Sequence, residues 1–332
     1  MTTAQITPDA ARELVIAVFS GAGMPAELAE PAARALVLAE QEGLPSHGLA
    51  RAPFYAAQMR AGKVRASAEP KLARDGAILR VDAGFGLAFG AIDAGARAAR
   101  EIVQELGLAA VAISHSHHFG VAGQAVEPFA HEGLIALAMS NSPAAIAPWG
   151  GDRALFGTNP IAFAAPRAVG DPLVIDLSLS HVARGKVMLA QKSGQPIPEG
   201  WALDMHGNPT TDADAALAGT MVPAGGAKGA ALALMVELLT AGLTGAQFAY
   251  QASSLFDDKG PPPDLAHLIL VLDPARFAPG FADRAEAIFT AIEAQDGARL
   301  PGARRRVERT ARATMLEIPG SLHETLERLA AG

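Results

Sequence analysis

The alternation of short apolar runs with helical patterns between residues 77 and 140 restricts the fold of this chain more than any other feature. Three runs are rich in β-forming residues, and a segment of helical periodicity separates each from the next: AILRVD (77–82), AAVAIS (109–114) and LIALAMS (134–140). Strands that alternate with helices indicate an α/β unit. Further strands are predicted in IAFAAP, PLVIDL and HLILVLD, so the expected fold class is mixed α/β.

The first 65 residues are predicted to be helical. Thr7-Pro8 is a typical helix start, and this first helix is expected to end at Gly21. A second helix is expected to stop at Gly43, and a helical segment follows the motif SHGLAR. The N-terminal part of the chain is therefore expected to pack as helices.

The last third of the chain predicts three more helices. The run KGAALALMVELLTAGL is apolar on nearly all sides, which predicts a buried helix. A helix is also expected at 281–295, followed by a basic loop, LPGARRR. The sequence Ser321-Leu322-His323-Glu324 predicts a capping box that opens the final helix.

Length, charge and cysteine content exclude several classes of protein. A chain of 332 residues is long enough for two or three packed units. Its net charge of -7 and its lack of a long basic tract argue against nucleic acid as a partner. The absence of cysteine excludes disulfides and thiolate metal sites. With no visible secretory signal and no membrane-spanning run, we expect a soluble cytoplasmic protein.

The segment VDAGFGLAFG joins a predicted strand to a predicted helix through Gly84, Gly86 and Gly90. A Rossmann fingerprint requires G-x-G-x-x-G, and here the last spacing is one residue too long. The next strand also lacks the terminal acidic residue that would bind a ribose hydroxyl. The glycines therefore predict a strand-to-helix turn and no dinucleotide site of the Rossmann type.

The segment SHSHHFG contains His115, His117 and His118. No Asp, Glu or Cys lies close by in the sequence, and alternating side chains of an extended segment point in opposite directions, so we expect no metal site. One interpretation is a loop that offers backbone N–H groups and an imidazole to an anion or a cofactor at the start of the following helix. The other is a solvent-exposed loop with incidental histidines.

The motif SHGLAR combines Ser46, His47 and Arg51 in an apolar neighbourhood. If Ser46 caps a helix that starts at His47, then His47 and Arg51 lie on the same face, one turn apart. A guanidinium fork would then bind a carboxylate beside an imidazole suited to proton transfer. The alternative is a capped helix with two polar surface residues.

Two further clusters are candidates for anion binding. The segment 176–186, DLSLSHVARGK, could bind phosphates and a carboxylate, or could be only a polar helix start. Lys228 lies in a glycine-rich turn before the apolar helix; the turn lacks the G-K-[ST] of a Walker A loop. A lysine at a helix N-terminus can still contact an anionic group.

Eight motifs together resemble one family along almost the whole chain: SHGLAR, HSHHFGVAG, SPAAIAPWGG, FGTNPIAFA, IDLSLSHVARGK, PEGWALDMHGNPTTD, GGAKGAALALMVELL and RLPGARRR. This is the malate/L-lactate dehydrogenase family that is unrelated to the Rossmann-fold lactate dehydrogenases. Its members include ureidoglycolate and sulfolactate dehydrogenases, diketogulonate reductase and the Δ1-pyrroline-2-carboxylate/Δ1-piperideine-2-carboxylate reductases. The resemblance implies an NAD(P)-dependent oxidoreductase and a homodimer. It also implies a non-Rossmann cofactor domain with a largely β-sheet core, flanked by helical N- and C-terminal segments.

The resemblance also implies roles for individual residues. Ser46 and His47 resemble the catalytic pair, and in some members the histidine that matches His118 is the proton acceptor instead. The residues that resemble substrate contacts are Arg51, Thr158, Arg184 and Gly185. Those that resemble cofactor contacts are His118, Phe119, Gly120, Val121, Ala122, Asp176, Leu177, Ser178, Lys228, Gly302, Ala303, Arg304, Arg305 and Arg306. Some imine reductases carry an aspartate after the glycine that matches Gly185, whereas this chain has Lys186.

From these roles we expect hydride transfer to C2 of a small 2-oxo or 2-imino acid, with Arg51 on the carboxylate and His47, oriented by Ser46, as proton donor. The arginines at 304–306 suggest a 2'-phosphate site and hence NADPH, with NADH as the alternative. The wording of the motifs is most similar to the cyclic-imine reductases that form L-proline or L-pipecolate. A 2-hydroxy acid dehydrogenase is the second candidate, and a non-catalytic binding protein of the same fold is the third.

The expected organisation follows the same resemblance. Residues 1–75 form a helical segment that carries Ser46 and His47, and residues 116–264 form the NAD(P)-binding domain. Residues 76–115 and 265–332 form α/β segments that pack with the helical segment.

Overall fold

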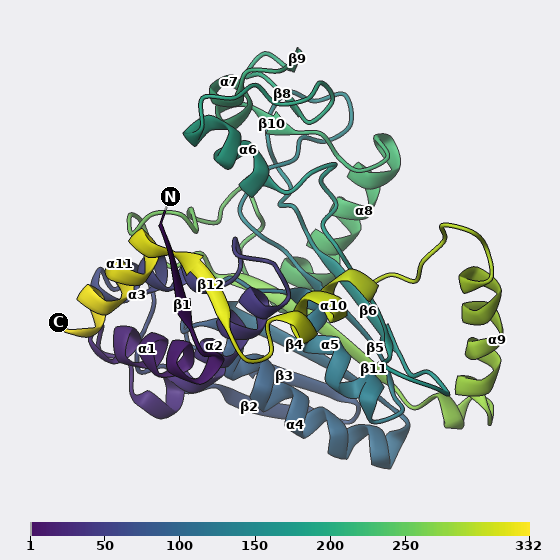
Figure 1. Ribbon diagram of the computed structural model, residues 1–332. Helices are drawn as coiled ribbons and strands as arrows, with labels where there is room; N and C mark the ends of the chain where they lie inside the picture. Colours follow the sequence, from purple (N-terminus) through teal and green to yellow (C-terminus); the bar gives the residue numbers. More distant parts are fainter. Residues whose placement is uncertain (1) are drawn as a thin grey trace.

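The computed structural model describes residues 2–332, and a seven-stranded mixed sheet lies at its centre (Figure 1). The strands are, in spatial order, β2 (Lys71–Asp75), β3 (Ile78–Asp82), β4 (Leu108–Ser116), β11 (Leu265–Leu272), β5 (Ile135–Ser140), β6 (Ile161–Ala165) and β7 (Leu173–Leu177). Only β3 and β4 are parallel; all other neighbours are antiparallel. The predicted mixed α/β class with a largely β-sheet core and flanking helices is confirmed.

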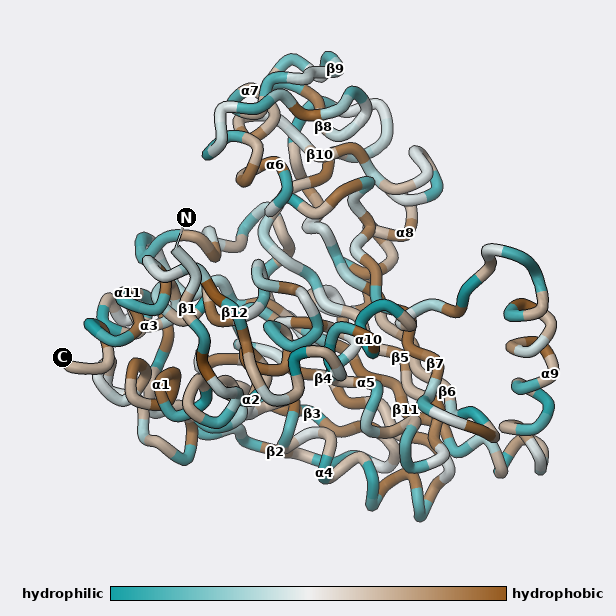
Figure 2. Tube along the Cα trace, viewed as in Figure 1, coloured by the Kyte–Doolittle hydropathy of each residue, from teal (hydrophilic) through white to brown (hydrophobic). Residues whose placement is uncertain are grey.

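The two faces of this sheet are covered by different helices. Along β11, Ile269 and Val271 face the cluster that includes α4 (Ala88–Leu106) and α5 (Ala122–His131). Leu268 and Leu270 face the other side, where α8 (Ala227–Glu237) and the π-helix η2 (Leu238–Gly242) pack. The alternation follows from the period of two along a strand. Apolar residues on both faces allow a strand to be buried on both, and most strands of the sheet are mainly hydrophobic in Figure 2; β2 at the edge, with the sequence KLARD, is exposed throughout.

The turn between β3 and α4 requires glycine at positions of VDAGFGLAFG, the segment that does not match the Rossmann fingerprint. Gly84 has φ +61°, a conformation that residues with a side chain rarely adopt. A Cβ at Gly86 would lie 2.8 Å from the Cβ of Ala68, so the turn packs too tightly for a side chain. The prediction of a glycine-dependent strand-to-helix turn is confirmed.

A second unit is built from both ends of the chain. The strands β1 (Thr3–Ile6) and β12 (Leu316–Pro319) pair antiparallel, and the two termini lie on the same side of the molecule (Figure 1). The helices of this unit are α1 (Pro8–Ser20), α2 (Ala26–Gln41), the 3-10 helix η1 (Leu49–Arg51), α3 (Ala52–Arg60) and α11 (Gly320–Ala330). Their apolar faces form one core, so the N-terminal helices expected from the sequence pack against the C-terminal one.

The remaining elements lie outside these two units. A small lobe at the top of Figure 1 contains α6 (Arg184–Lys192), β8 (Ala202–Leu203), β9 (Pro209–Thr210), α7 (Ala213–Ala218) and β10 (Thr220–Met221). The C-terminal third adds η3 (Pro274–Arg276), α9 (Phe281–Glu293) and α10 (Ala303–Ala311). The turns of α10 are hydrophilic in Figure 2, and none of its residues is buried.

Helix ends agree with the sequence in one place and differ in another. Thr7 caps α1, because its Oγ1 accepts the backbone N–H of Ala10 at 3.2 Å. The capping box at Ser321 is wrong: α11 begins one residue earlier, Pro319 is its N-cap, and no side chain caps it. Pro319, the last residue of β12, pairs with Thr3 of β1, and α11 begins directly after it. The helix therefore starts before Ser321 could cap it.

Two other predictions need correction. The basic loop ends at Gly302, and the arginines that follow it lie in the first turns of α10. The helix predicted to be buried, α8, is buried only along the side of Gly229, Ala233 and Val236. Leu234 is 45% exposed and Leu238, at the start of η2, is 54% exposed. The sheet therefore covers only part of the apolar surface of this helix.

The domain limits stay a prediction. The central sheet takes strands from residues 76–115, 116–264 and 265–332, and also β2 from the predicted helical segment.

Candidate active site

Ser46 and His47 lie in a tight turn between α2 and η1. The N–H of His47 donates to Leu44 O at 2.9 Å, and the N–H of Gly48 donates to Pro45 O at 3.2 Å. The predicted helix from His47 is therefore wrong, because the residues from His47 to Gly48 form turns and the helical conformation starts only at Leu49.

The cap of η1 comes from α2 and not from Ser46. The buried Glu40 carboxylate accepts the N–H of Leu49 at 3.0 Å. A Cβ at Gly48 would lie 2.2 Å from the same carboxylate, so only glycine fits between the two segments. Burial raises the pKa of Glu40, while the bond from Leu49 and the nearby Arg312 lower it. Glu40 and Leu49 are nine residues apart, in two different helical elements. Their contact replaces the local cap by Ser46 that the sequence suggested.

The turn still brings the three motif residues together. Ser46 Oγ lies 3.0 Å from His47 Nδ1, and Arg51 Nε donates to Ser46 O at 2.8 Å. Ser46 is exposed and His47 is half-buried. The turn therefore holds a hydroxyl and an imidazole at the surface of a site whose guanidinium lies deeper.

A second imidazole faces the first. The rings of His47 and His118 have centroids 5.3 Å apart, and the hydroxyl of Tyr55 lies 2.6 Å from His118 Nδ1. Tyr55 is fully buried, and burial raises its pKa to about 12. The direction of this bond depends on the tautomer of His118: when the hydroxyl donates to Nδ1, the neutral imidazole carries its proton on Nε2. Tyr55 was missed in the sequence, although it follows Arg51 by one helical turn.

The histidines of the site favour the neutral form. Burial and the nearby Arg51 lower the pKa of His47 to about 4. The pKa of His118 is lowered well below its ordinary value by burial, Arg51 and the neighbouring imidazoles. Neutral imidazoles can accept a proton, which suits the oxidation of a hydroxyl group.

Arg51 has an unused hydrogen-bond donor. The residue is 7% exposed, its Nε donates to Ser46 O, and its Nη1 is buried without a hydrogen-bond partner among residues 2–332. The Phe256 ring lies against the guanidinium, with the Cζ 4.7 Å from the ring centroid. A buried guanidinium N–H without a partner is costly, so this position favours an anionic ligand.

The start of α6 lies against the same turn. A Cβ at Gly185 would be 3.6 Å from the Cβ of Ser46, so these two predicted site residues are neighbours. Arg184 is half-buried and donates to Leu217 O at 3.1 Å; burial lowers its pKa. Lys186 is exposed and forms no ion pair among residues 2–332. The site therefore has cationic groups on two sides, from η1 and from α6.

Thr158 lies in a loop that is fixed by buried polar groups. Its N–H donates to Ser142 Oγ at 3.0 Å, and its carbonyl accepts the N–H of Leu179 at 2.7 Å. Asn159 has φ +39° and donates to Glu237 Oε1 at 2.8 Å. The non-glycine left-handed conformation at Asn159 is thus stabilised by a buried carboxylate. Within residues 2–332, no hydrogen bond joins Thr158 to the Ser46 turn.

The segment from His118 to Ala122 leads into α5, as the sequence suggested. Phe119 is buried and stacks on His267, with ring centroids 4.6 Å apart. Gly120 has φ +81°, and a Cβ there would lie 2.7 Å from the Phe89 ring. Val121 is the N-cap of α5. The interpretation as a solvent-exposed loop with incidental histidines is therefore wrong, because its residues are packed at a helix N-terminus.

Asp176 and Arg305, both partly buried, belong to a network of charges around the buried Glu42 and Glu127. Asp176 Oδ2 accepts the N–H of Gly123 at 2.8 Å and Arg305 Nη1 at 3.1 Å. Arg305 also pairs with Glu42 at 2.9 Å, and Arg309 bonds both Glu42 and Glu127. Burial raises the pKa of Asp176, while the bond from Gly123 and Arg305 lower it. Arg305 thus links α10, β7 and the end of α2.

The other predicted cofactor residues are more exposed. Ser178 Oγ lies 3.0 Å from Ser180 Oγ, just beyond the exposed Leu177. Arg306 pairs with Asp171 at 3.7 Å. Lys228, on the first turn of α8, and Arg304, on the first turn of α10 after Gly302 and Ala303, are exposed and form no ion pair among the described residues. The two exposed cations could bind phosphates, whereas Arg305 is already paired.

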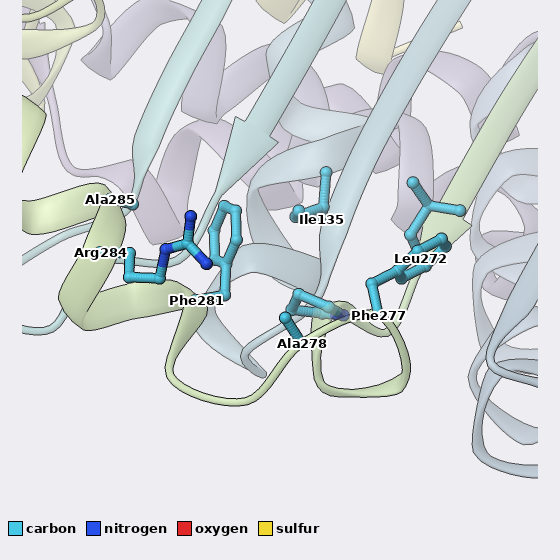
Figure 3. A pocket seen from close by; sticks show the side chains of 8 residues that line it. Ile135, Leu272, Phe277, Ala278, Phe281, Arg284 and Ala285 are labelled. Atoms are coloured by element: carbon cyan, nitrogen blue, oxygen red, sulfur yellow. The ribbon is translucent and has the colours of Figure 1, made fainter.

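A separate pocket lies at the other end of the sheet and contains none of the predicted site residues (Figure 3). Its volume is about 460 Å³, and Figure 3 shows Arg284 beside the Phe281 ring at its edge. The lining is otherwise apolar: Ile135, Leu272, Pro274, Phe277, Ala278 and Ala285. It offers no group suited to proton or hydride transfer.

Two absences concern only the residues that the structure describes. No group of three or more His, Asp or Glu side chains is arranged to hold a metal ion within residues 2–332. In the same range, no helix is long and apolar enough to cross a membrane.

Nearly the whole chain matches a family of dehydrogenases. A family model described as malate/L-lactate dehydrogenase covers residues 6–327. The chain belongs to this family and is an oxidoreductase, as the motifs predicted. Every motif quoted for the resemblance lies within the matched range.

Within the family, the chain is similar to sulfolactate dehydrogenases and to cyclic-imine reductases. The chain is 58% identical over 320 residues to a (2R)-3-sulfolactate dehydrogenase (NADP(+)) of Chromohalobacter salexigens, covering 96% of each chain. It is 41% identical over 310 residues to a Δ1-pyrroline-2-carboxylate/Δ1-piperideine-2-carboxylate reductase of Pseudomonas putida, covering 90% of this chain and 88% of the relative. The crystal structure of Δ1-piperideine-2-carboxylate reductase from Pseudomonas syringae pv. tomato superposes with a TM-score of 0.91 at 37% identity, covering 98% of this chain and 99% of that one.

Proposed function

We propose that this enzyme uses NADP(H) to interconvert a small 2-hydroxy acid and its 2-oxo acid, and that its substrate carries a second anionic group, as 3-sulfolactate does. The relative at 58% identity is named for that substrate, and the imine reductases are more distant at about 40%. This order differs from the sequence-based prediction, which put the cyclic imines first.

The observation that carries the proposal is the unused donor of Arg51. Its Nη1 is buried beside the Ser46–His47 turn, without a hydrogen-bond partner in the described part of the chain. A substrate carboxylate there would satisfy this N–H and neutralise the buried charge. The 2-hydroxy group next to that carboxylate would then come within reach of the two imidazoles.

His47 is the proposed acid and base. As a neutral imidazole whose pKa is lowered to about 4, it can accept the proton of the hydroxyl group during oxidation. Ser46 would orient its ring through Nδ1, which lies 3.0 Å from the hydroxyl. With the Tyr55 hydroxyl donating to its Nδ1, His118 would carry its proton on Nε2 and donate a hydrogen bond to the same substrate oxygen.

The second anion of the substrate would bind at the start of α6. Arg184 and Lys186 flank Gly185, which approaches Ser46. Amides in the first turn of a helix and nearby cations favour an anion. Some imine reductases have an aspartate in place of Lys186, and a carboxylate at this position would repel a sulfonate.

The exposed cations of α8 and α10 fit a phosphate-bearing cofactor. Lys228 and Arg304 form no ion pair among residues 2–332, which matches the chemistry of a pyrophosphate and a 2'-phosphate, whereas the N–H of Gly123 at the start of α5 already donates to Asp176. Bound NADP(H) would supply or accept the hydride. The chain's own residues would orient the acid and move the proton.

Cyclic 2-imino acids are the second candidate. The ring of Phe256 beside Arg51 offers an apolar surface on which the ring of pyrroline- or piperideine-2-carboxylate could pack. The same Arg51 would bind their carboxylate, and an imidazole would protonate the nitrogen.

Steady-state rates decide between the two candidates. With NADPH, we expect the highest kcat/KM for 3-sulfopyruvate, a lower value for pyruvate and oxaloacetate, and the lowest for the two cyclic imines. Lys186→Asp should lower kcat/KM for 3-sulfopyruvate at least about tenfold and leave pyruvate nearly unchanged, because only the former carries a second anion near that position. Activity confined to the cyclic imines would refute the proposal.

A homodimer is part of the proposal. The apolar side of α8 and η2 that the sheet leaves exposed includes Leu234, Met235 and Leu238, and such a surface is typical of a subunit interface. Sedimentation equilibrium of the purified protein would give the assembly.

A further inference from the structure

Lys63 is a buried lysine that lies just beyond the end of α3. Its side chain has no exposed surface, and its ammonium donates to the carbonyls of Ser254 at 2.6 Å, Lys259 at 2.7 Å and Asp257 at 3.2 Å. An ammonium has three N–H groups, so these acceptors satisfy all of them. Because a buried charge is costly unless it is satisfied in this way, the three carbonyls are fixed relative to α3.

The fixed carbonyls all belong to one loop, residues 254–259, which comes from a distant part of the sequence. Gln58, also fully buried, donates to Asp257 O at 2.8 Å and adds a second attachment to the same point. Within the loop, the N–H of Phe256 donates to Ser254 Oγ at 3.1 Å. The backbone on both sides of Phe256 is therefore held against α3.

The side chain of Phe256 is the link between this loop and the candidate active site. Its ring lies against the guanidinium of Arg51, with the Cζ 4.7 Å from the ring centroid. The Nε of Arg51 is bound to Ser46 O, so the ring on one face and the carbonyl at one edge together restrict the guanidinium plane. The two N–H groups of the buried Nη1, which has no hydrogen-bond partner among residues 2–332, are thereby fixed in direction within that plane.

We propose that Lys63 and the loop 254–259 are positioning elements for Arg51: they keep the Phe256 ring on the guanidinium and so direct its unused N–H at the substrate carboxylate. This inference rests on the proposed role of Arg51 as the carboxylate ligand. It predicts that Lys63 and Phe256 affect every 2-oxo acid alike, whereas Lys186 affects only those with a second anion.

Binding of oxamate, a planar monocarboxylate, to the enzyme saturated with NADP+ tests the inference by calorimetry. Phe256→Ala and Lys63→Met should each raise the Kd of oxamate about tenfold, and Phe256→Tyr should restore it, because a ring that covers the cation is worth about that factor. The Kd of NADP+ should not change. Phe256→Ala should cause no further loss in an Arg51→Ala background, because both would remove the same oriented donor.

Matched controls are Lys71→Met, an exposed lysine of β2, and Phe277→Ala, a phenylalanine that is 71% exposed at the other end of the sheet. Neither should change oxamate binding.

The inference is wrong if Arg51→Ala loses oxamate while Phe256→Ala and Lys63→Met bind it as the wild type does, or if the effects of Phe256→Ala and Arg51→Ala add. If Arg51→Ala binds oxamate normally, or the wild type does not bind it, the role of Arg51 fails and this inference fails with it. If Lys63→Met does not fold, Phe256→Ala alone gives the answer.

Discussion

The imidazole rings of His47 and His118 face each other with centroids 5.3 Å apart, one in the turn before η1 and the other in the segment that enters α5. Each ring has its own hydroxyl partner on Nδ1, Ser46 Oγ at 3.0 Å for His47 and Tyr55 at 2.6 Å for His118. The helical N-terminal unit and the segment that leaves the C-terminal end of β4 in the central sheet thus contribute one imidazole each. Because both are candidates for the proton transfer, variants of each residue separate their roles.

We expect His47→Ala to lower kcat by a factor on the order of a hundred to ten thousand, because it removes the proposed acid and base. The Kd of NADPH, measured by fluorescence titration, should stay within about twofold, since small changes far from the phosphates cost little. His206→Ala, at an exposed loop position, serves as the control. Unchanged turnover in His47→Ala would transfer the role to His118.

Tyr55→Phe removes only the hydroxyl that bonds His118. If this hydroxyl fixes the proton of His118 on Nε2, the variant should lose about tenfold in kcat, because the neutral ring can then adopt the wrong tautomer. KM should change little, since the ring of Tyr55 keeps its packing against Phe19 and Phe89. A normal kcat together with a raised KM would indicate that the hydroxyl contacts the substrate directly.

The sequence predicted six of the seven strands of the central sheet, because those strands carry the pattern themselves. The exposed strand β2, with the sequence KLARD, lies in the segment predicted to be helical and was missed. The runs at 77–82, 134–140 and 267–273 are continuous or alternating apolar segments, and all are strands. The short strand β1 and its partner β12 were missed, because four-residue strands at the chain ends have no such pattern and form only when the two ends pair. Local periodicity cannot show a pairing across the whole chain.

The candidate site was predicted by its residues and not by its geometry. The proximity of Ser46, His47 and Arg51 was expected from a helix, but it comes from a turn that the buried Glu40 caps. Tyr55 could have been found from its helical spacing to Arg51. Phe256 and Lys63 could not, because a loop far away in the sequence brings the first to Arg51 and nothing local marks the second.

Arg304 and Arg305 are neighbours in the sequence with different expected roles. Arg305→Ala leaves the fully buried Glu42 and the carboxylate of Asp176 with one cation fewer, so we expect the free energy of unfolding to fall by about 3 kcal/mol. Arg304→Ala is its matched control, since Arg304 is exposed and unpaired among residues 2–332. It should change the free energy of unfolding by less than about 0.5 kcal/mol.

For cofactor affinity we expect the larger effect in Arg304→Ala, the variant with the smaller effect on stability. Arg304→Ala should raise the Kd of NADPH more than that of NADH, since only NADPH carries the 2'-phosphate. Denaturant unfolding and fluorescence titration measure the two effects. Equal losses of stability in both variants would contradict the assignment of Arg305 to the buried network.

His267 makes the stability of the protein depend on pH. The ring is fully buried between two serines, with Nδ1 at 2.8 Å from Ser140 Oγ and Nε2 at 2.8 Å from Ser116 Oγ. Burial lowers its pKa to about 3 from the ordinary value of 6.5. Between these two values the unfolded chain binds a proton that the folded chain does not, so the free energy of unfolding falls as the pH falls from 6.5 towards 3.

His117 and His47, whose pKa values are lowered to about 3 and about 4 by burial, act in the same direction. The variant His267→Gln isolates the contribution of His267 to the pH dependence of the free energy of unfolding. His267→Gln keeps an uncharged donor and acceptor for the two serines and cannot bind the proton. Its free energy of unfolding should be lower than that of the wild type at pH 7, because the amide is a poorer fit. Between pH 6.5 and 4, however, it should decline less steeply, by up to about 1.4 kcal/mol per pH unit, the value for one proton. Urea unfolding at a series of pH values gives both slopes, and parallel slopes would show that His267 takes no part in the acid sensitivity.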